Sequence, residues 1–289
     1  MKAAPFDYYA PETVEEACQH LASAGGGAAV LAGGQTLMPL LALRMSQPFI
    51  VVDINRIGAL TGVERTAEGV SVGATTRQNE ILVDETVGLT LPMLVTAMRH
   101  VGHHQTRNRG TLGGSIALGE PAAEQPATAV ALGAQVEVCS IRGTRRIAAE
   151  EFYVGPYMTI LEPDELVTRV HYPIWPSNTV QVFREVNRRP GDFALVGLVG
   201  GLEISGGKIA RAGLGWFGMG PTPIKARQAE RALTGQSIAD IDVEGVAELA
   251  LADTDPFDDH HASAPYRRAV GRRIFKRAIA DALTARHAA

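Results

Sequence analysis

The chain alternates short apolar runs with amphipathic stretches, and this pattern predicts a mixture of strands and helices. Runs rich in β-branched residues predict strands, because such side chains pack well on a pleated surface. Amphipathic stretches that follow a capping residue or end at glycine predict helices, the first of them after a capping box at Thr13–Glu16. In the first half we expect strands at 29–31, 49–54, 69–74, 134–139 and 165–170, and helices at 13–24, 37–44, 76–80, 92–101 and 126–132.

The stretch Trp175–Asn178 is the expected domain boundary, because it follows the strand that Pro173 ends. Beyond it, three apolar segments at 180–186, 193–204 and 208–217 predict strands together with a helix. Three further helices are expected at 225–233, 241–250 and 265–284, the last with an apolar stripe facing basic residues. The pattern therefore predicts an α+β protein of two domains, residues 1–176 and 177–289.

Size and charge narrow the class of protein. The chain has 289 residues and a formal net charge of −4. Two domains fit this length at roughly 100–200 residues each. Nucleic acid is not an expected partner, because its phosphates call for a basic surface. No apolar run is long enough to cross a membrane, and the first residues lack the apolar core of a signal peptide, so we expect a cytoplasmic protein.

The two cysteines, Cys18 and Cys139, are far apart in the sequence and form no Cys-x-x-Cys pair. They therefore predict neither a disulfide framework nor a zinc or iron–sulfur site within this chain. Free cysteines are typical of a reducing compartment such as the cytoplasm.

Two glycine-rich segments are the strongest candidates for chemistry. Residues 31–37 have the sequence LAGGQTL and residues 109–116 have RGTLGGSI, in a chain with 31 glycines. Glycine lets backbone amides approach an anion, a hydroxyl adds a donor, and the helix expected after the first segment favours phosphate at its N-terminus. One such segment is explained as well by a tight strand–helix turn without a ligand. Two in one domain suit a ligand with two phosphates.

Neither segment is a P-loop, because the lysine of Gly-x-x-x-x-Gly-Lys is absent. A literal Gly-x-Gly-x-x-Gly does occur at Gly213–Gly218, but Pro221 and Pro223 follow where a dinucleotide-binding fold requires a helix. We therefore expect these glycines to serve strand packing or an interface.

The histidines suggest no clear site. His100, His103 and His104 lie around Gly102, which interrupts the helical spacing that a pair of ligands would use, and His260 and His261 follow two aspartates in a polar cluster. Loop and cap roles are commoner than metal binding for such clusters, so we expect no metal site. A Gly-x-Ser-x-Gly nucleophile turn is absent, and we expect no catalytic acid, base or nucleophile here.

Three long segments resemble the FAD-binding medium subunit of molybdenum hydroxylases, the group of xanthine dehydrogenase and aerobic carbon monoxide dehydrogenase. They are residues 32–41 (AGGQTLMPLL), residues 105–124 around RGTLGGSIA, and residues 188–197 (RRPGDFALVG). Tyr266–Arg268 at the start of the last helix also fits, so the resemblance extends over the whole chain. It implies a vanillyl-alcohol-oxidase (PCMH) type FAD-binding domain, followed by a smaller α+β domain.

The resemblance also implies which residues hold the cofactor. Glu124 stands at the place of an acidic residue that contacts the adenosine part of FAD, and Val101 and Val167 at apolar positions along the cofactor. Arg184 and Phe193 match positions near the flavin ring; Phe193 is explained equally well by core packing. The FAD pyrophosphate would lie on the two glycine segments, at Ala32, Gly33, Gly34, Gln35, Thr36 and Leu37 and at Thr111, Gly113, Gly114 and Ser115.

Two departures from the family concern polar contacts near the flavin ring. Many relatives have Ala-His-Ala-Asp-Pro where this chain has Ala117–Pro121 without the histidine, and many have proline at His104. The two glycine segments are intact, so the departures leave the implied FAD binding unaffected.

The implied function is electron transfer from the iron–sulfur clusters of one partner subunit, through FAD here, to an external acceptor. Substrate would react at molybdopterin on a large subunit, and the 2Fe–2S clusters would lie on a small subunit, in a dimer of heterotrimers. Substrate, acceptor and the oligomeric state of the isolated chain stay open. Two alternatives remain: a stand-alone flavin oxidase of the same fold, and a non-catalytic nucleotide-binding protein.

Overall fold

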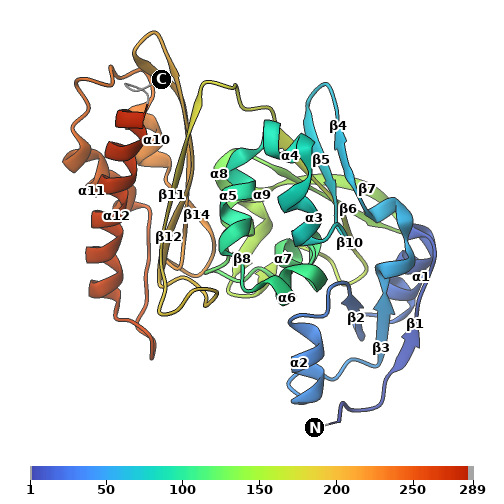
Figure 1. The fold of residues 1–289 in the computed structure, drawn as a ribbon. Helices are drawn as coiled ribbons and strands as arrows, with labels where there is room; N and C mark the ends of the chain where they lie inside the picture. The colour runs from blue at the N-terminus through green and yellow to red at the C-terminus, as the bar shows by residue number, and fades with distance from the viewer. Residues whose placement is uncertain (1, 286–289) are drawn as a thin grey trace.

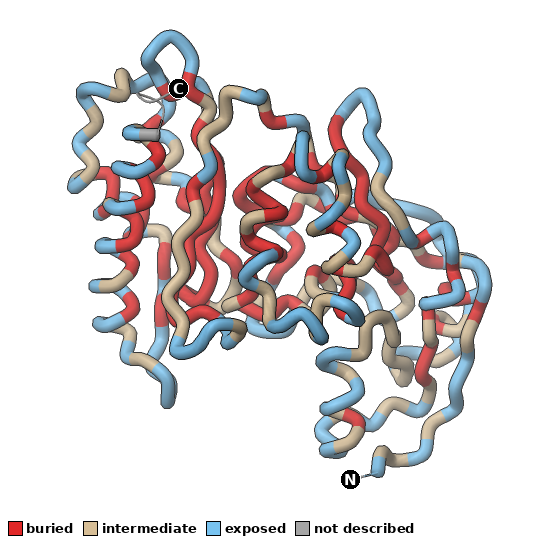
Figure 2. Tube along the Cα trace, in the orientation of Figure 1, coloured by how far each residue is buried: buried red, intermediate tan, exposed pale blue. Residues whose placement is uncertain are grey.

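The computed structural model describes residues 2–285 and arranges them around three successive β-sheets. In Figure 1 a small N-terminal sheet lies at one side, a five-stranded sheet in the middle, and a four-stranded sheet with the C-terminal helices at the other side. Figure 2 shows that the buried residues follow the middle and C-terminal sheets and the helices between them. The described part of the chain contains no helix with the length and apolar character needed to traverse a bilayer.

The N-terminal sheet is parallel, in the order β1 (Asp7–Tyr9), β3 (Ile50–Asp53), β2 (Ala28–Leu31). Its helices are α1 (Val14–Ser23), α2 (Leu37–Ala42) and two 3-10 turns, η1 (Ile54–Arg56) and η2 (Gly58–Leu60). The Thr13 hydroxyl caps α1 by accepting from the Glu16 amide at 3.2 Å, as predicted, but the Glu16 carboxylate accepts from the Glu12 amide. The second hydrogen bond of the predicted capping box is therefore donated by the amide of Glu12 and not by that of Thr13.

The middle sheet is antiparallel, in the order β4 (Val63–Arg65), β5 (Gly69–Gly73), β10 (Leu166–Pro173), β6 (Gln135–Ser140), β7 (Gly143–Ala148). The connections supply a short hairpin, β8 (Tyr153–Gly155) with β9 (Met158–Thr159), and seven helices: α3 (Gln78–Val83), α4 (Glu85–Thr90), α5 (Pro92–His100), α6 (His104–Arg109), α7 (Leu112–Leu118), α8 (Glu124–Leu132) and α9 (Ala149–Phe152). The elements of this region that were not predicted are helices α4, α6, α7 and α9 and strands β4, β7, β8 and β9.

The C-terminal sheet is antiparallel with strands in chain order: β11 (Thr179–Val186), β12 (Val196–Ser205), β13 (Lys208–Phe217) and β14 (Ile224–Lys225). Helices α10 (Arg227–Leu233), α11 (Val243–Ala252) and α12 (Ala264–Ala285) follow it. The helix expected among the three apolar segments is absent, since all three are strands within the described residues. Strand β12 is buried on both faces, and such a strand is a continuous apolar run that periodicity alone does not distinguish from a buried helix.

Helix α8 lies between the middle and C-terminal sheets, and all nine of its residues are buried. Two glycines of β13 let the strand approach this helix closely. A Cβ atom at Gly213 would lie 2.5 Å from the carbonyl oxygen of Ala131, and one at Gly215 would lie 2.7 Å from that of Ala127. The predicted packing role of the Gly213–Gly218 string is confirmed at these two positions.

We expect Gly215→Ala to destabilise the protein by about 1–3 kcal/mol, because the added methyl group overpacks the contact between β13 and α8. Urea denaturation measures the difference in unfolding free energy. Gly88→Ala is the matched control: a Cβ there meets nothing within 4 Å, and alanine in a helix interior is favoured by about 0.5–1 kcal/mol. Equal stability of the two variants would contradict the packing argument.

Candidate functional site

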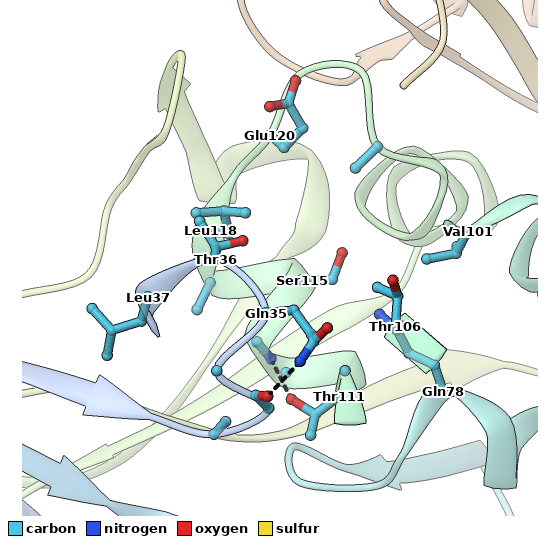
Figure 3. A pocket seen from close by; sticks show the side chains of 18 of the residues that line it. Gln35, Thr36, Leu37, Gln78, Val101, Thr106, Thr111, Ser115, Leu118 and Glu120 are labelled. Atoms are coloured by element: carbon cyan, nitrogen blue, oxygen red, sulfur yellow. Dashed lines mark hydrogen bonds between the residues drawn. The ribbon is translucent and has the colours of Figure 1, made fainter. Parts of the chain in front are cut away.

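A cavity of about 520 Å³ lies where the N-terminal sheet, the helices of the middle sheet and one loop of the C-terminal unit meet. Figure 3 shows its wall, with Gln35 and Thr111 facing one another and Glu120 and Val101 farther along. The volume lies within the roughly 300–1,000 Å³ usual for small-molecule sites. Every site residue expected from the sequence except Arg184 lines this cavity.

The loop between β2 and α2 presents backbone amides to the cavity. Within the described residues, the amides of Gly33, Gly34, Gln35 and Thr36 donate no hydrogen bond to another part of the chain. Gly34 has φ +70°, a conformation that favours glycine, and the Gln35 side chain donates to the Gly33 carbonyl at 3.2 Å. Consecutive amides without partners form an anion-binding concavity.

The second glycine segment is held against the first through backbone contacts. A Cβ atom at Gly33 would lie 2.4 Å from the carbonyl oxygen of Arg109 and 2.8 Å from the Cα atom of Gly110. A Cβ atom at Gly113 would lie 2.4 Å from the Cβ atom of Ala74. These two glycines are therefore required by the packing of the chain on itself, independently of any ligand.

The second segment was also expected to offer free amide donors, but its amides already donate hydrogen bonds within the chain. Gly113 donates to the Ala74 carbonyl at 2.9 Å, Gly114 to the Thr111 hydroxyl at 3.1 Å, and Ser115 to the Thr111 carbonyl at 3.2 Å. The segment begins α7, and these bonds are its cap and first turn. What it offers the cavity is the exposed backbone of Gly114 and the hydroxyls of Thr111 and Ser115.

The cavity wall carries acidic side chains, and none of its described lining residues is lysine or arginine. Glu165 is held ionised by Arg145 through two hydrogen bonds of 2.7 and 2.8 Å, which lower the pKa of this carboxyl. Glu120 accepts from the Tyr157 hydroxyl and from the Ala122 amide. Hydrogen-bond donors specific to each carboxyl therefore offset the negative charge of Glu165 and Glu120.

Glu124 is the least relieved of these carboxyls. It is the first residue of α8 and is 4% exposed, and its own backbone amide is the one hydrogen-bond donor that lowers its pKa. Burial, followed by the nearby charge of Glu185, raises the pKa of Glu124 to about 8. The carboxyl is therefore largely protonated and neutral at pH 7.

One loop of the C-terminal unit closes the cavity. The ring of His103 lies so close to Gly191 that a Cβ atom there would be 2.5 Å from its Cε1 atom. Phe193 follows in the same loop and is 59% exposed. It also lines the cavity, so its ring is not packed in the core, which disagrees with core packing as its role.

Arg184 is the one expected site residue that lies elsewhere. It is on β11, donates to the Phe183 carbonyl and forms an ion pair with Asp281 of α12. His104, His260 and His261 also lie outside the lining: His104 contacts Asn108, and the rings of His260 and His261 are tilted against one another with their centroids 3.9 Å apart. Among the residues that the structure describes, no group of three or more histidine, cysteine, aspartate or glutamate side chains could hold a metal.

Sequence reasoning missed several lining residues. Gln78 and Thr106 lie on helices that border the second segment, and the Gln78 Oε1 atom is buried without a hydrogen-bond partner. The three segments that resemble the FAD-binding family could have indicated these residues, because most of the missed residues lie within or beside them. They include Gly102, His103, Gly110, Ala117, Leu118, Glu120, Ala123, Gly191 and Asp192.

The raised pKa of Glu124 predicts a pH-dependent stability. The folded state binds this proton more tightly than the unfolded chain, whose carboxyl has the ordinary pKa of 4.5. The stabilisation is present below that pKa and is lost as pH rises through about 8. In the ligand-free protein, Glu124→Gln should reduce the fall in unfolding free energy between about pH 5 and pH 9 by roughly 1–3 kcal/mol. Urea denaturation across this range measures it; Glu68→Gln, at a carboxyl 87% exposed, should leave the profile unchanged.

Comparisons with known proteins agree with this geometry. Residues 4–175 match the model of the FAD binding domain in molybdopterin dehydrogenase, and residues 181–282 match that of the CO dehydrogenase flavoprotein C-terminal domain. The chain is 37% identical to 6-hydroxypseudooxynicotine dehydrogenase complex subunit alpha of Paenarthrobacter nicotinovorans, over 98% of this chain and 96% of that protein. It is 32% identical to the carbon monoxide dehydrogenase medium chain of Hydrogenophaga pseudoflava, over 95% and 96%.

Solved structures are similar over the same extent. A chain of carbon monoxide dehydrogenase from Hydrogenophaga pseudoflava superposes with a TM-score of 0.95 at 34% identity, covering 99% of both chains. A chain of quinoline 2-oxidoreductase from Pseudomonas putida 86 gives 0.91 at 36% identity, again over 99% of both. The α+β fold and its two family regions are thereby confirmed. The chain belongs to the family of FAD-binding medium subunits of molybdenum hydroxylases and is an oxidoreductase flavoprotein subunit of that family.

Proposed function

We propose that this chain holds FAD in the cavity and passes electrons from iron–sulfur clusters of a partner subunit to an external acceptor. The observation that carries the proposal is the row of partnerless amides at Gly33–Thr36, facing the hydroxyls of Thr111 and Ser115 across one cavity. This arrangement suits a pyrophosphate, because amides and hydroxyls can bind its oxygens where no lysine or arginine lines the wall. When bound, FAD supplies the electron-carrying chemistry.

The other lining residues would orient the cofactor. Val101 and Val167 present apolar surface, and the exposed ring of Phe193 suits packing near the flavin ring. Phe193 lies in the loop between β11 and β12, closed by a 2.8 Å hydrogen bond from the Leu195 amide to the Val186 carbonyl. Glu124, at the start of α8, also lines the cavity, and we propose that it contacts the adenosine part of FAD, as the resemblance implies.

The two family regions support a division into an FAD-binding domain of residues 1–176 and a C-terminal domain of residues 177–289. The proposed partners are a large molybdopterin-binding subunit and a small 2Fe–2S subunit, assembled as a dimer of heterotrimers in the cytoplasm. The names of the relatives, a complex subunit and a medium chain, support a multi-subunit assembly. The two cysteines of this chain are too few to ligate a cluster, which supports clusters on another subunit.

We expect purified protein to contain FAD, and Gly34→Val and Gly114→Val to lose it. Valine at Gly34 would strain a backbone at φ +70°, and valine at Gly114 would cover exposed backbone in the cavity. Loss of two charge-assisted hydrogen bonds to a phosphate corresponds to an affinity decrease of about 100-fold or more. Absorbance of released flavin and its chromatographic identity measure the content.

Gly215→Ala is the control for this experiment, because it perturbs packing at α8 and not the amide row. It should be less stable yet keep its FAD. Wild-type protein that neither contains FAD nor takes it up on reconstitution would contradict the proposal and favour a non-catalytic nucleotide-binding protein.

Co-purification tests the partners. Tagged chain expressed with its neighbouring genes should retain a molybdopterin-binding subunit and a subunit with iron–sulfur absorbance. Protein that instead purifies alone and oxidises an alcohol or amine without partners would favour the stand-alone flavin oxidase.

A further inference from the structure

The two glycine segments of the cavity are joined by side chains and not by their own backbones. Among the described residues, no backbone hydrogen bond runs between residues 32–36 and residues 109–115. The contact at Gly33 sets how near the segments can come, and no backbone hydrogen bond accompanies it. Two polar side chains that are not part of the cavity lining, Asn55 and Arg77, complete the connection.

Asn55 lies in η1, directly after β3, and bonds to the first segment. Its Nδ2 atom donates to the Ala32 carbonyl at 2.9 Å and to the Asp53 carboxylate, and its Oδ1 atom accepts from Arg77 at 2.6 Å. The Asp53 carboxylate also accepts from the backbone amide of Asn55 at 2.9 Å and from the Tyr8 hydroxyl at 2.6 Å. The side-chain amide of Asn55 satisfies these partners in one orientation only, because the reverse would place its oxygen against two acceptors.

Arg77 directly precedes α3 and reaches the second segment. One nitrogen of its guanidinium donates to the Arg109 carbonyl, and another donates to the Oδ1 atom of Asn55. The guanidinium is a planar group whose donors have a fixed geometry, so the two bonds fix the position of one acceptor relative to the other. The hydrogen bonds from Ala32 through Asn55 and Arg77 to Arg109 form a side-chain bridge between the two segments.

The bond to Ala32 also directs the first amide of the partnerless row. The Ala32 carbonyl and the Gly33 amide belong to one trans peptide unit and point in opposite directions. Because Asn55 is not a lining residue, a carbonyl that it holds points away from the cavity and leaves the Gly33 amide directed at it. Without this bond the peptide unit is free to turn, and a ligand would have to order it on binding.

We propose that Asn55 and Arg77 are positioning residues for FAD. They hold the two glycine segments at the separation that the pyrophosphate requires, and Asn55 directs the Gly33 amide to it. The inference rests on the proposed function, because it needs FAD in the cavity. Asn55 is exposed and Arg77 is half-buried, so the loss of either side chain opens no space in the core.

The first test compares FAD affinity in the purified full chain, after removal of FAD and titration with FAD. Asn55→Ala and Arg77→Ala should each weaken binding by about tenfold or more, because the ligand must then order the segments itself. The double variant should lose little more than the weaker single variant, because the two side chains act in series. Flavin fluorescence during the titration measures the affinity.

Arg56→Ala is the matched control. It removes the same charge next to Asn55 from an exposed side chain, and it should bind FAD as wild type does. Urea denaturation of the FAD-free variants checks their folding: Asn55→Ala and Arg77→Ala should unfold close to the wild-type urea concentration, whereas the stabilisation that FAD adds should shrink.

Chemical rescue separates positioning from a packing role of Arg77. Millimolar guanidinium should restore the FAD affinity of Arg77→Ala, because the free ion can donate to the Arg109 carbonyl and to Asn55. The same addition should leave Asn55→Ala unchanged. Weaker binding of Arg77→Ala that guanidinium does not restore would assign Arg77 a packing role and overturn the bridge.

The remaining outcomes separate this inference from the proposed function. Asn55→Ala and Arg77→Ala proteins that bind FAD with wild-type affinity overturn the positioning role and leave the proposed function standing. Equal weakening in Arg56→Ala also overturns it, because loss of positive charge then explains the effect. A wild-type chain that takes up no FAD overturns the proposed function, and the positioning role with it.

Discussion

The cavity depends on one contact between two backbones. Gly33 lies against the carbonyl of Arg109 and the Cα atom of Gly110 so closely that no side chain fits between them. This contact fixes the separation between the amide row after β2 and the hydroxyls at the start of α7. Gly113 repeats the device one turn later, against Ala74 at the end of β5. Segments distant in the sequence therefore act as one rigid binding surface, and the glycines are fixed by packing before any ligand is considered.

A second close approach links this surface to the C-terminal unit. Gly213 and Gly215 allow β13 to pack against α8, and the first residue of α8 is Glu124 in the cavity wall. The Gly218 amide donates to the Pro121 carbonyl at 2.9 Å, and the buried Arg267 of α12 donates to the Gly218 and Leu195 carbonyls. The C-terminal unit contributes few lining residues, yet it sets the position of Glu124 and of the loop that carries Phe193.

Sequence and resemblance located the two glycine segments of the cavity, because these are contiguous and their composition is itself informative, whereas more than half of the lining residues were missed. Helices α6 and α7 were missed since both are short, and the two glycines of α7 have low helix propensity. The error at Arg184 has a different origin. Side chains alternate between the faces of a strand, so Phe183 and Glu185 point toward α5, while Arg184 points the other way, to Asp281 of α12. The strand was identified correctly and the face was not, because the face depends on which helices pack against β11.

The acidic wall places a condition on any dianionic ligand. A pyrophosphate in a cavity without lining lysine or arginine is held by dipoles alone, and ionised carboxylates nearby would oppose it. Three of the wall carboxyls have their negative charge offset or absent: Glu165 pairs with Arg145, Glu120 accepts from Tyr157, and Glu124 keeps its proton, while Asp192 is exposed to solvent. The wall is therefore closer to neutral than its composition suggests, so binding of the anion and protonation of Glu124 favour one another.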